Sequence, residues 1–135
     1  MAAFVKFQPT VAALANGVHD LASDGLKVAL MTHANTPAVT NADLGDLTPI
    51  AYTNLSTQVI VTISSTQTAG VYTLVLTDLV LTASGAVATF RHVVVYNDDA
   101  AADELLAWFD YGSDVTLANG ETFTIDFGAS LFELE

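Results

Sequence analysis

The sequence VYTLVLTDLVLTASGAVATFRHVVVYND, residues 71–98, constrains the fold more than any other stretch, because apolar and polar residues alternate along most of it. Alternation with a period of two is typical of strands that bury one face. The phase of the apolar residues shifts at Thr77–Asp78, between Leu76 and Leu79, which predicts a β-bulge. The tripeptide ASG at 83–85 predicts the turn of a hairpin. This stretch therefore predicts consecutive antiparallel strands.

The strand after this turn, and the next one at 104–112, each present two faces, because successive side chains of a strand point to opposite sides. On the first strand we expect one face to carry Ala88, Phe90, His92, Val94 and Tyr96, and the other to carry Val87, Thr89, Arg91, Val93 and Val95. On the second strand we expect one face to carry Leu106, Trp108 and Asp110, and the other to carry Phe109 and Tyr111.

Four further segments have the residue pattern of strands, namely 25–32, 56–64, 121–127 and 131–135. The alternation is clearest in the third of them, where polar residues separate Phe123, Ile125 and Phe127. We therefore expect these three side chains to lie in the core.

One short amphipathic helix is predicted within 9–23. Its apolar stripe, at spacings of three, four and three residues, consists of Val11, Leu14, Val18 and Leu21. Thr10 is the expected N-cap. Because a glycine at position 17 weakens the helix by about 1 kcal/mol relative to alanine, we expect the helix to form by packing on a sheet.

Many short strands, turn signals and a single helix are typical of a mainly β domain. We predict one domain over 1–135, an antiparallel β-sandwich with a jelly-roll-like architecture and one short N-terminal helix. Residues 33–57 have few periodic apolar positions and are expected to form a long loop or arm. Long loops in compact domains often serve function, or become ordered only on a partner.

The charge of the chain disfavours several classes of partner. Three basic residues stand against fifteen acidic ones, which gives a formal net charge of −12. A phosphate backbone or an anionic membrane surface would be repelled, so we expect neither nucleic acid nor a membrane among the partners. No apolar run approaches the roughly 18–20 residues that a membrane-crossing helix needs.

The chain is also unusually apolar for its size. Of its 135 residues 52% are hydrophobic, and the mean hydropathy is +0.49. A domain this small buries only about 60–70% of its chain surface by itself. We therefore expect part of the apolar surface to be buried between subunits of a homo-oligomer, of which a trimer is one arrangement. An unusually apolar monomer core is the alternative.

Five residues with side-chain oxygens crowd the segment between the strands that end near 96 and begin near 104. They are Asn97, Asp98, Asp99, Asp103 and Glu104. A calcium loop would need such oxygens at alternating positions around a central glycine. That glycine is absent, and three alanines interrupt the oxygens. We therefore predict a solvated hairpin tip and no metal site, with calcium binding as the alternative.

Two carboxylates offer the strongest case for catalysis. Asp110 and Asp114 lie near the aromatic residues Trp108 and Tyr111, as in a sugar-cleaving cleft, which would make the chain a small acidic hydrolase. Acidic side chains at strand ends are, however, ordinary solubilising residues. We therefore predict that the chain is not an enzyme and has no catalytic residues.

The histidines and serines add no further catalytic motif. The three histidines, His19, His33 and His92, are scattered without a metal-binding spacing. No serine lies in a nucleophile elbow, and no phosphate-binding glycine motif occurs. We expect no cofactor. His19 is expected on the polar edge of the helix, and His92 is expected to be a strand side chain satisfied by a neighbour.

The aromatic residues Trp108, Phe109 and Tyr111 form the candidate interaction surface. Aromatic side chains dominate both cores and interfaces, so each face of this strand has two interpretations. We expect one face to pack in the core. The other face is the candidate for contact with a second subunit.

Three segments carry a resemblance to a known family. They are KVALMT at 27–32, TLVLTDLVLTASGAVATFRHVVVYND at 73–98 and LLAWFDYGSDVTLANGETFTIDF at 105–127. The chain resembles a widespread family of small structural proteins encoded in the virion modules of tailed bacteriophages. The likeness covers most of the chain beyond residue 10, and is weakest over 33–57 and at the C-terminal end. Where relatives have a glycine-rich stretch before the second strand, this chain has AYTNLSTQV at 51–59.

The resemblance implies a virion structural protein. The first expectation is a capsid decoration, or cement, protein that is made in the host cytoplasm, lies on the capsid exterior, binds the major capsid protein and stabilises the shell. The alternative is a component of a tail or fibre tip, such as a receptor- or carbohydrate-binding module that uses Trp108 and Tyr111.

Overall fold

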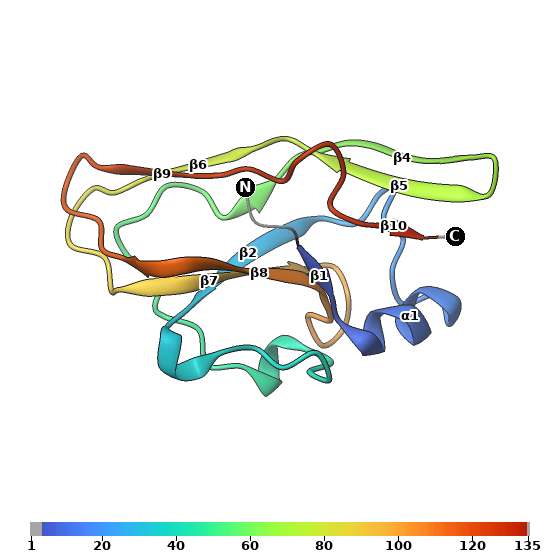
Figure 1. The fold of residues 1–135 in the computed structure, drawn as a ribbon, viewed down its shortest axis with the longest axis horizontal. Helices are drawn as coiled ribbons and strands as arrows, with labels where there is room; N and C mark the ends of the chain where they lie inside the picture. The colour runs from blue at the N-terminus through green and yellow to red at the C-terminus, as the bar shows by residue number, and fades with distance from the viewer. Residues whose placement is uncertain (1–3, 135) are drawn as a thin grey trace.

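The computed structural model describes residues 4–134 and has two layers of antiparallel strands that face each other (Figure 1). The five-stranded sheet has the order β1 (Val5–Lys6), β8 (Leu105–Val115), β7 (Phe90–Asn97), β2 (Leu26–Met31) and β3 (Val59–Ile60). The other layer consists of the sheet β10 (Glu133–Leu134), β5 (Val71–Leu76) and β4 (Thr62–Thr68), and of the pair β6 (Leu79–Thr82) and β9 (Thr122–Ile125). The prediction of a mainly β, antiparallel, sandwich-like fold with one helix is confirmed.

The main core lies between these two layers. Both layers contribute large side chains that are almost completely buried, among them Val28, Leu74, Leu81, Phe90, Leu106 and Ile125. The three residues of the clearest alternation, Phe123, Ile125 and Phe127, all lie in this core, as predicted. Their alternation succeeds because β9 buries one face against the opposite sheet and exposes the threonines of the other.

A second, smaller core lies on the other side of the five-stranded sheet. Its buried members are Phe7, Ala29, Met31, Val94, Tyr96 and Leu105. The helix α1 (Gln8–Ala15) and the single-turn helices η1 (His33–Asn35) and η2 (Leu44–Asp46) lie on this side (Figure 1). The middle strands β2 and β7 are therefore buried on both faces. No helix within residues 4–134 is long and apolar enough to cross a membrane.

The long segment 33–57 is a loop, and much of it packs on the sheet. The amide of Leu44 donates to the Asp103 carbonyl oxygen at 3.1 Å, and the amide of Ile50 donates to the Leu30 carbonyl oxygen at 2.9 Å. The side chains of Leu44 and Leu47 cover the second core. Of the two predicted forms, a long loop or an arm, the segment is therefore a loop, and part of it covers the second core.

The helix is shorter than predicted. It ends at Ala15, because Gly17 adopts a φ of 76°, outside the helical region. Val18 and the buried Leu21 therefore lie beyond the helix, and the predicted four-residue stripe is wrong. Thr10 is not the N-cap: it is buried within the helix, and its hydroxyl oxygen lies 2.8 Å from the Leu105 carbonyl oxygen of β8.

The phase shift at Thr77–Asp78 marks a break between strands, so the predicted bulge is wrong. The break separates β5, which pairs with β4 and β10, from β6, which pairs with β9. At this break Asp78 Oδ1 accepts a hydrogen bond from the Phe127 amide at 3.0 Å. The predicted hairpin at 83–85 is also wrong, because the chain crosses there from β6 to β7 in the opposite layer.

Two irregularities between β7 and β8 change the predicted faces. The register shifts between Phe90 and His92, so Phe90 lies in the main core with Val93. A second shift opposite Val95–Tyr96 places Leu106 in the main core, on the other side of the sheet from Trp108. A register shift by an odd number of residues moves a side chain to the opposite face.

Candidate functional site

The fold separates the aromatic residues that were expected to form one surface. Phe109 is buried in the main core, where its ring meets Phe4 edge-on at a centroid distance of 4.6 Å. Trp108 packs against the second core, and its Nε1 atom is buried without a hydrogen-bond partner among residues 4–134. Tyr111 alone is well exposed, and its ring rests edge-on against Phe123 at 5.0 Å. These residues therefore make no shared aromatic platform.

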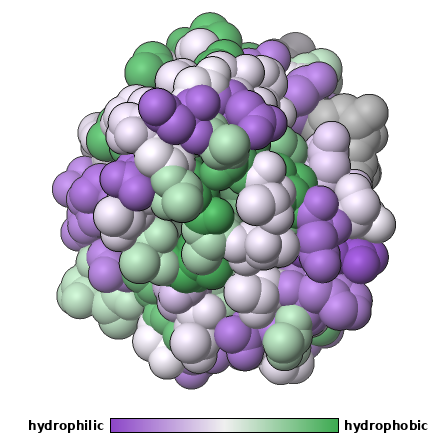
Figure 2. Space-filling view, turned by 90° about the vertical axis from the view of Figure 1, so that its left-hand side faces the viewer, coloured by the Kyte–Doolittle hydropathy of each residue, from purple (hydrophilic) through white to green (hydrophobic). Residues whose placement is uncertain are grey.

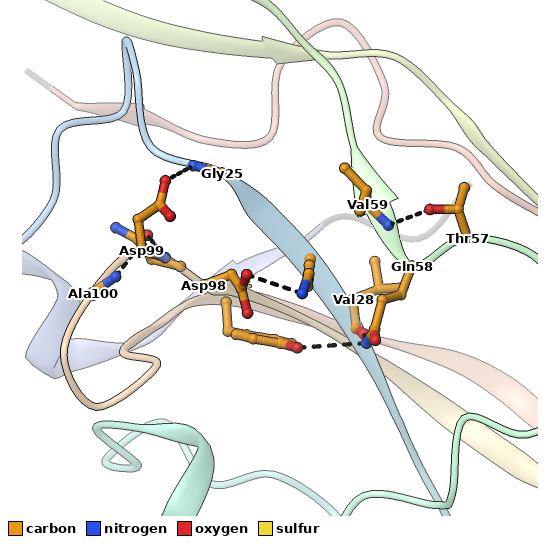
Figure 3. Close-up of polar contacts among 11 residues, drawn as sticks. Gly25, Val28, Thr57, Gln58, Val59, Asp98, Asp99 and Ala100 are labelled. Carbon is orange, nitrogen blue, oxygen red and sulfur yellow. Dashed lines mark hydrogen bonds and ion pairs between the residues drawn. The ribbon is translucent and has the colours of Figure 1, made fainter.

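Residues 97–104 form the tip of the β7–β8 hairpin, as predicted. Asp98 Oδ2 lies 2.9 Å from Lys27 Nζ, and Asp99 Oδ2 accepts a hydrogen bond from the Gly25 amide at 2.6 Å (Figure 3). These exposed carboxylates fasten the tip to the start of β2 and do not converge on one point. Within the described part of the chain, no group of three or more His, Cys, Asp or Glu residues is placed to hold a metal ion.

The buried side chain of Asn97 anchors this tip, a role that the sequence reasoning missed. Its Oδ1 accepts from the amides of Asp99 and Ala100 at 3.0 and 3.2 Å, which fixes the orientation of the side-chain amide. Its Nδ2 then donates to Asp24 Oδ2 at 2.6 Å and to His19 Nδ1 at 2.9 Å. Burial lowers the pKa of His19, against the opposing effect of nearby carboxylates, so the neutral imidazole is favoured.

A second polar cluster lies between the loop and the sheet. Arg91 holds Asp110 with two bonds, Nε to Oδ1 at 2.7 Å and Nη2 to Oδ2 at 3.2 Å. Together with the Gly112 amide, this guanidinium lowers the pKa of Asp110 to about 2. His92 is buried beside them, with Nδ1 3.9 Å from Asp110 Oδ1 and Nε2 3.1 Å from Thr36 Oγ1.

Asp110, His92 and Thr36 lie in the order of a hydrolase triad of acid, histidine and hydroxyl, but the directions of their hydrogen bonds do not fit one. The Thr36 hydroxyl lies 2.8 Å from the His33 carbonyl oxygen, which can only accept, so its hydrogen points there. His92 Nε2 must therefore donate to Thr36 Oγ1, which leaves Nδ1 without a hydrogen toward Asp110. A triad histidine must instead accept the hydroxyl proton. The cluster ties the loop to β7 and β8.

Asp110, one of the two carboxylates considered for catalysis, is not placed to act as a general acid at neutral pH. Because the bond with Arg91 lowers the pKa of Asp110 to about 2, Asp110 is ionised at neutral pH. Asp114 is exposed to solvent. A glycosidase acid needs a raised pKa so that it carries a proton at working pH. The environment of Asp110 has the opposite effect on its pKa.

A hollow of about 270 Å³ lies where the residues after α1 meet β4, β5 and β10. Its apolar lining includes Leu14, Leu21 and Leu134. Its two hydroxyls, Ser65 Oγ and Tyr72 Oη, are bonded to each other at 2.8 Å. Burial raises the pKa of Tyr72, so its phenol stays protonated. His19 and Asp20 also line the hollow, but His19 Nδ1 accepts from Asn97 Nδ2, and within residues 4–134 neither residue is hydrogen-bonded to Ser65 or Tyr72.

Three exposed apolar side chains follow one another at alternate positions where the chain passes from β3 to β4, and two of them are the most exposed large apolar side chains among residues 4–134. Val59, Val61 and Ile63, here called the apolar stripe, have exposed fractions of 48%, 61% and 63%. They alternate with the buried Ile60 and the half-buried Thr62. The apolar side chains of an alternating strand normally face a core. Because these three side chains face outward instead, the stripe is a candidate contact surface.

The stripe belongs to a segment without charge in an otherwise acidic chain. Residues 47–77, here called the uncharged segment, contain no Asp, Glu, Lys, Arg or His, although the net charge of the chain is −12. Lys27 lies opposite Val59 in the β2–β3 pairing, and the ion pair with Asp98 neutralises it (Figure 3). The spacing of charges along the sequence would have been enough to find this segment.

Apolar side chains also reach the surface at the end of the sandwich where the chain crosses between layers, on the left in Figure 1. Figure 2 shows a hydrophobic area there with hydrophilic side chains around it. The β8–β9 region at this end differs from the uncharged segment, because residues 110–126 include four carboxylates. The stripe, in contrast, lies on a segment of 31 residues, 47–77, that carries no charge.

Comparisons with known proteins identify no relative. No protein-family model matches the chain, no curated protein is similar to it, and no solved structure matches its fold.

Proposed function

We propose that the chain is a structural protein of a tailed-bacteriophage virion, a capsid decoration or cement protein that binds the assembled coat lattice. It would lie on the capsid exterior after synthesis in the host cytoplasm, with the major capsid protein and further copies of itself as partners. The resemblance of residues 27–32, 73–98 and 105–127 to phage structural proteins is the reason for placing it in a virion.

One structural feature supports an assembly role above all, namely the apolar stripe on the uncharged segment. An exposed row of Val59, Val61 and Ile63 would be unfavourable on a protein that works alone. The polar groups in the described residues that suggested chemistry are instead engaged in holding the fold, as the Arg91–Asp110 pair and the Asn97 network illustrate. The acidic remainder of the surface suits a position away from packaged DNA.

The mechanism is mass action. A ligand that binds the assembled shell and not the free coat subunits shifts the equilibrium toward the shell. If several copies act together, each further contact becomes intramolecular, so modest individual contacts add up to firm attachment. Stabilisation of the shell against internal pressure would then need no catalysis and no cofactor.

The alternative of a carbohydrate-binding module at a tail or fibre tip has less support. It would use Trp108 and Tyr111 as a stacking surface for a sugar. Trp108 packs against the second core with Nε1 buried, whereas Tyr111 contacts Phe123 of the main core. A glycan array that shows binding lost on Tyr111→Ala, with the fold intact, would favour this alternative.

Rebinding to stripped capsids tests the proposal. Capsids from which the protein has been removed are incubated with the purified chain, and occupancy and the temperature of shell disruption are measured, with free coat subunits as the control. We expect saturable binding to assembled shells, no binding to free subunits, and a higher disruption temperature. Absence of binding to shells, or equal binding to shells and free subunits, would contradict it.

A further inference from the structure

The strand β4 is an unpaired edge of its layer. It pairs with β5 on one side, and on the other side no described strand is hydrogen-bonded to it. The neighbouring edge at β3 is partly closed by its own chain, because Thr57 Oγ1 accepts from the Val59 amide at 3.0 Å (Figure 3). An open edge presents a row of free backbone donors and acceptors, which is a template for a further strand.

The residues of β4 do little to block such pairing. Natural edge strands are protected by lysines, prolines, inward charges or bulges. From Thr62 to Thr68 the sequence TISSTQT has no charged residue and no proline. One bulge is present, at Ile63 between Thr62 and Ser64. Beyond it the register from Ser64 to Thr68 is continuous, so a regular open edge remains.

We propose that β4 pairs antiparallel with β4 of a second copy of this chain, and that the stripe residues Val61 and Ile63 pack across the two-fold axis. The two strands would join the β10-β5-β4 sheets of both copies into one continuous sheet. This inference deepens the proposed function, on whose self-association it rests. It names a two-fold contact, whereas a trimer was one arrangement considered for the predicted homo-oligomer.

The distribution of charge favours a second copy of this chain as the partner of the β4 edge. A two-fold contact places one surface against itself, so any net charge on that surface repels its own image. The chain carries a net charge of −12, yet the uncharged segment that contains β4 adds nothing to such repulsion. The ion pair of Lys27 with Asp98 cancels the cation opposite Val59. A basic partner protein would instead be drawn to the acidic faces elsewhere.

Two substitutions of opposite charge at one position separate edge pairing from general electrostatics. In a two-fold contact, both Val61→Lys and Val61→Glu bring like charges together, so each should raise the dimer Kd at least about a hundredfold. If only the net charge of −12 mattered, the added Lys would reduce the repulsion between copies and strengthen association, whereas the added Glu would weaken it. Val80 on β6, with an exposed fraction of 49%, provides matched controls in Val80→Lys and Val80→Glu. Thr66→Lys repeats the test on the regular part of the edge.

Sedimentation across a range of concentrations, with hydrogen exchange of the Ser64–Thr68 amides, is the measurement. We expect wild type and both Val80 variants to form dimers with protected β4 amides. Both Val61 variants and Thr66→Lys should be folded monomers, with a cooperative unfolding transition whose midpoint no longer depends on protein concentration, and with faster β4 exchange. A wild-type monomer at all concentrations, an oligomer that leaves β4 unprotected, or equal loss in the Val80 variants would overturn the inference.

The result is separable from that of capsid rebinding. A monomer that still binds stripped shells would refute the β4 contact and leave the proposed function standing. A dimer with protected β4 amides that does not bind shells would support the contact and refute the proposed function.

Discussion

Replacement of Asn97 by alanine should cost more stability than any other single change at the hairpin tip. The side chain is fully buried and joins four partners: the amides of Asp99 and Ala100, the Asp24 carboxylate and His19 Nδ1. A buried polar group that loses its partner costs about 1–3 kcal/mol. The Asp24 carboxylate can regain water, whereas the buried imidazole nitrogen and at least one amide cannot do so fully. We therefore expect a loss of about 2–4 kcal/mol.

Urea unfolding monitored by tryptophan fluorescence measures this loss, and an unchanged m-value shows that the comparison is between like states. Asn41→Ala is the matched control, because Asn41 makes one exposed bond, from the Ala38 amide to its Oδ1 at 2.7 Å. The control should lose less than about 1 kcal/mol. Equal, small losses for Asn97→Ala and Asn41→Ala would refute the reasoning, since the tip would then be the solvated loop that its composition suggested.

Three further predictions concern the core, a turn and pH. Phe123→Ala and Phe127→Ala should each lower the free energy of unfolding by about 3–5 kcal/mol in urea titrations, and losses below 1 kcal/mol for both would contradict their burial. Ala69 has a φ of 52° in the two-residue turn between β4 and β5, so Ala69→Asn should raise the thermal midpoint through a gain of about 1 kcal/mol, and a lower midpoint would contradict the turn geometry. Burial lowers the pKa values of His19 and His92, so their contribution to stability should be fully present above about pH 6.5 and should fall as the pH drops toward the folded-state pKa values. The His19→Gln and His92→Gln variants should therefore lose less free energy of unfolding between pH 7 and 5 than wild type does. An equal loss would contradict the assignment.

The sequence alone predicted burial correctly where a single strand alternates regularly between apolar and polar residues. Phe123, Ile125 and Phe127 alternate without interruption, and the structure buries all three. The hairpin tip at 97–104 was also predictable, because two strong strands flank a polar segment. The triad-like row at His92 could not be predicted, since Thr36 and Asp110 approach it only after the long loop has folded over the sheet.

Errors arose where distant pairing overrode local signals. The turn residues at 83–85 suggested a hairpin, but β6 pairs with β9, which places Leu81 opposite Phe123. No local pattern specifies such a partner. The β7–β8 register shifts by three residues between Phe90 and His92, where Val115 and Asp110 are the partners, and by one residue at Leu106. Each odd shift moves a side chain to the opposite face without any change in composition. The apolar stripe was missed because Val59, Val61 and Ile63 look like core residues until their exposure is known.

Virion imaging at side-chain resolution tests the central claim, an assembly role on a capsid, most directly. We expect density for this chain on the outer surface of the shell, where coat subunits meet, with Val59, Val61 and Ile63 covered by a neighbouring copy. Density for the chain inside the tail or at a fibre tip, or the stripe facing solvent in an otherwise well-resolved capsid, would contradict it.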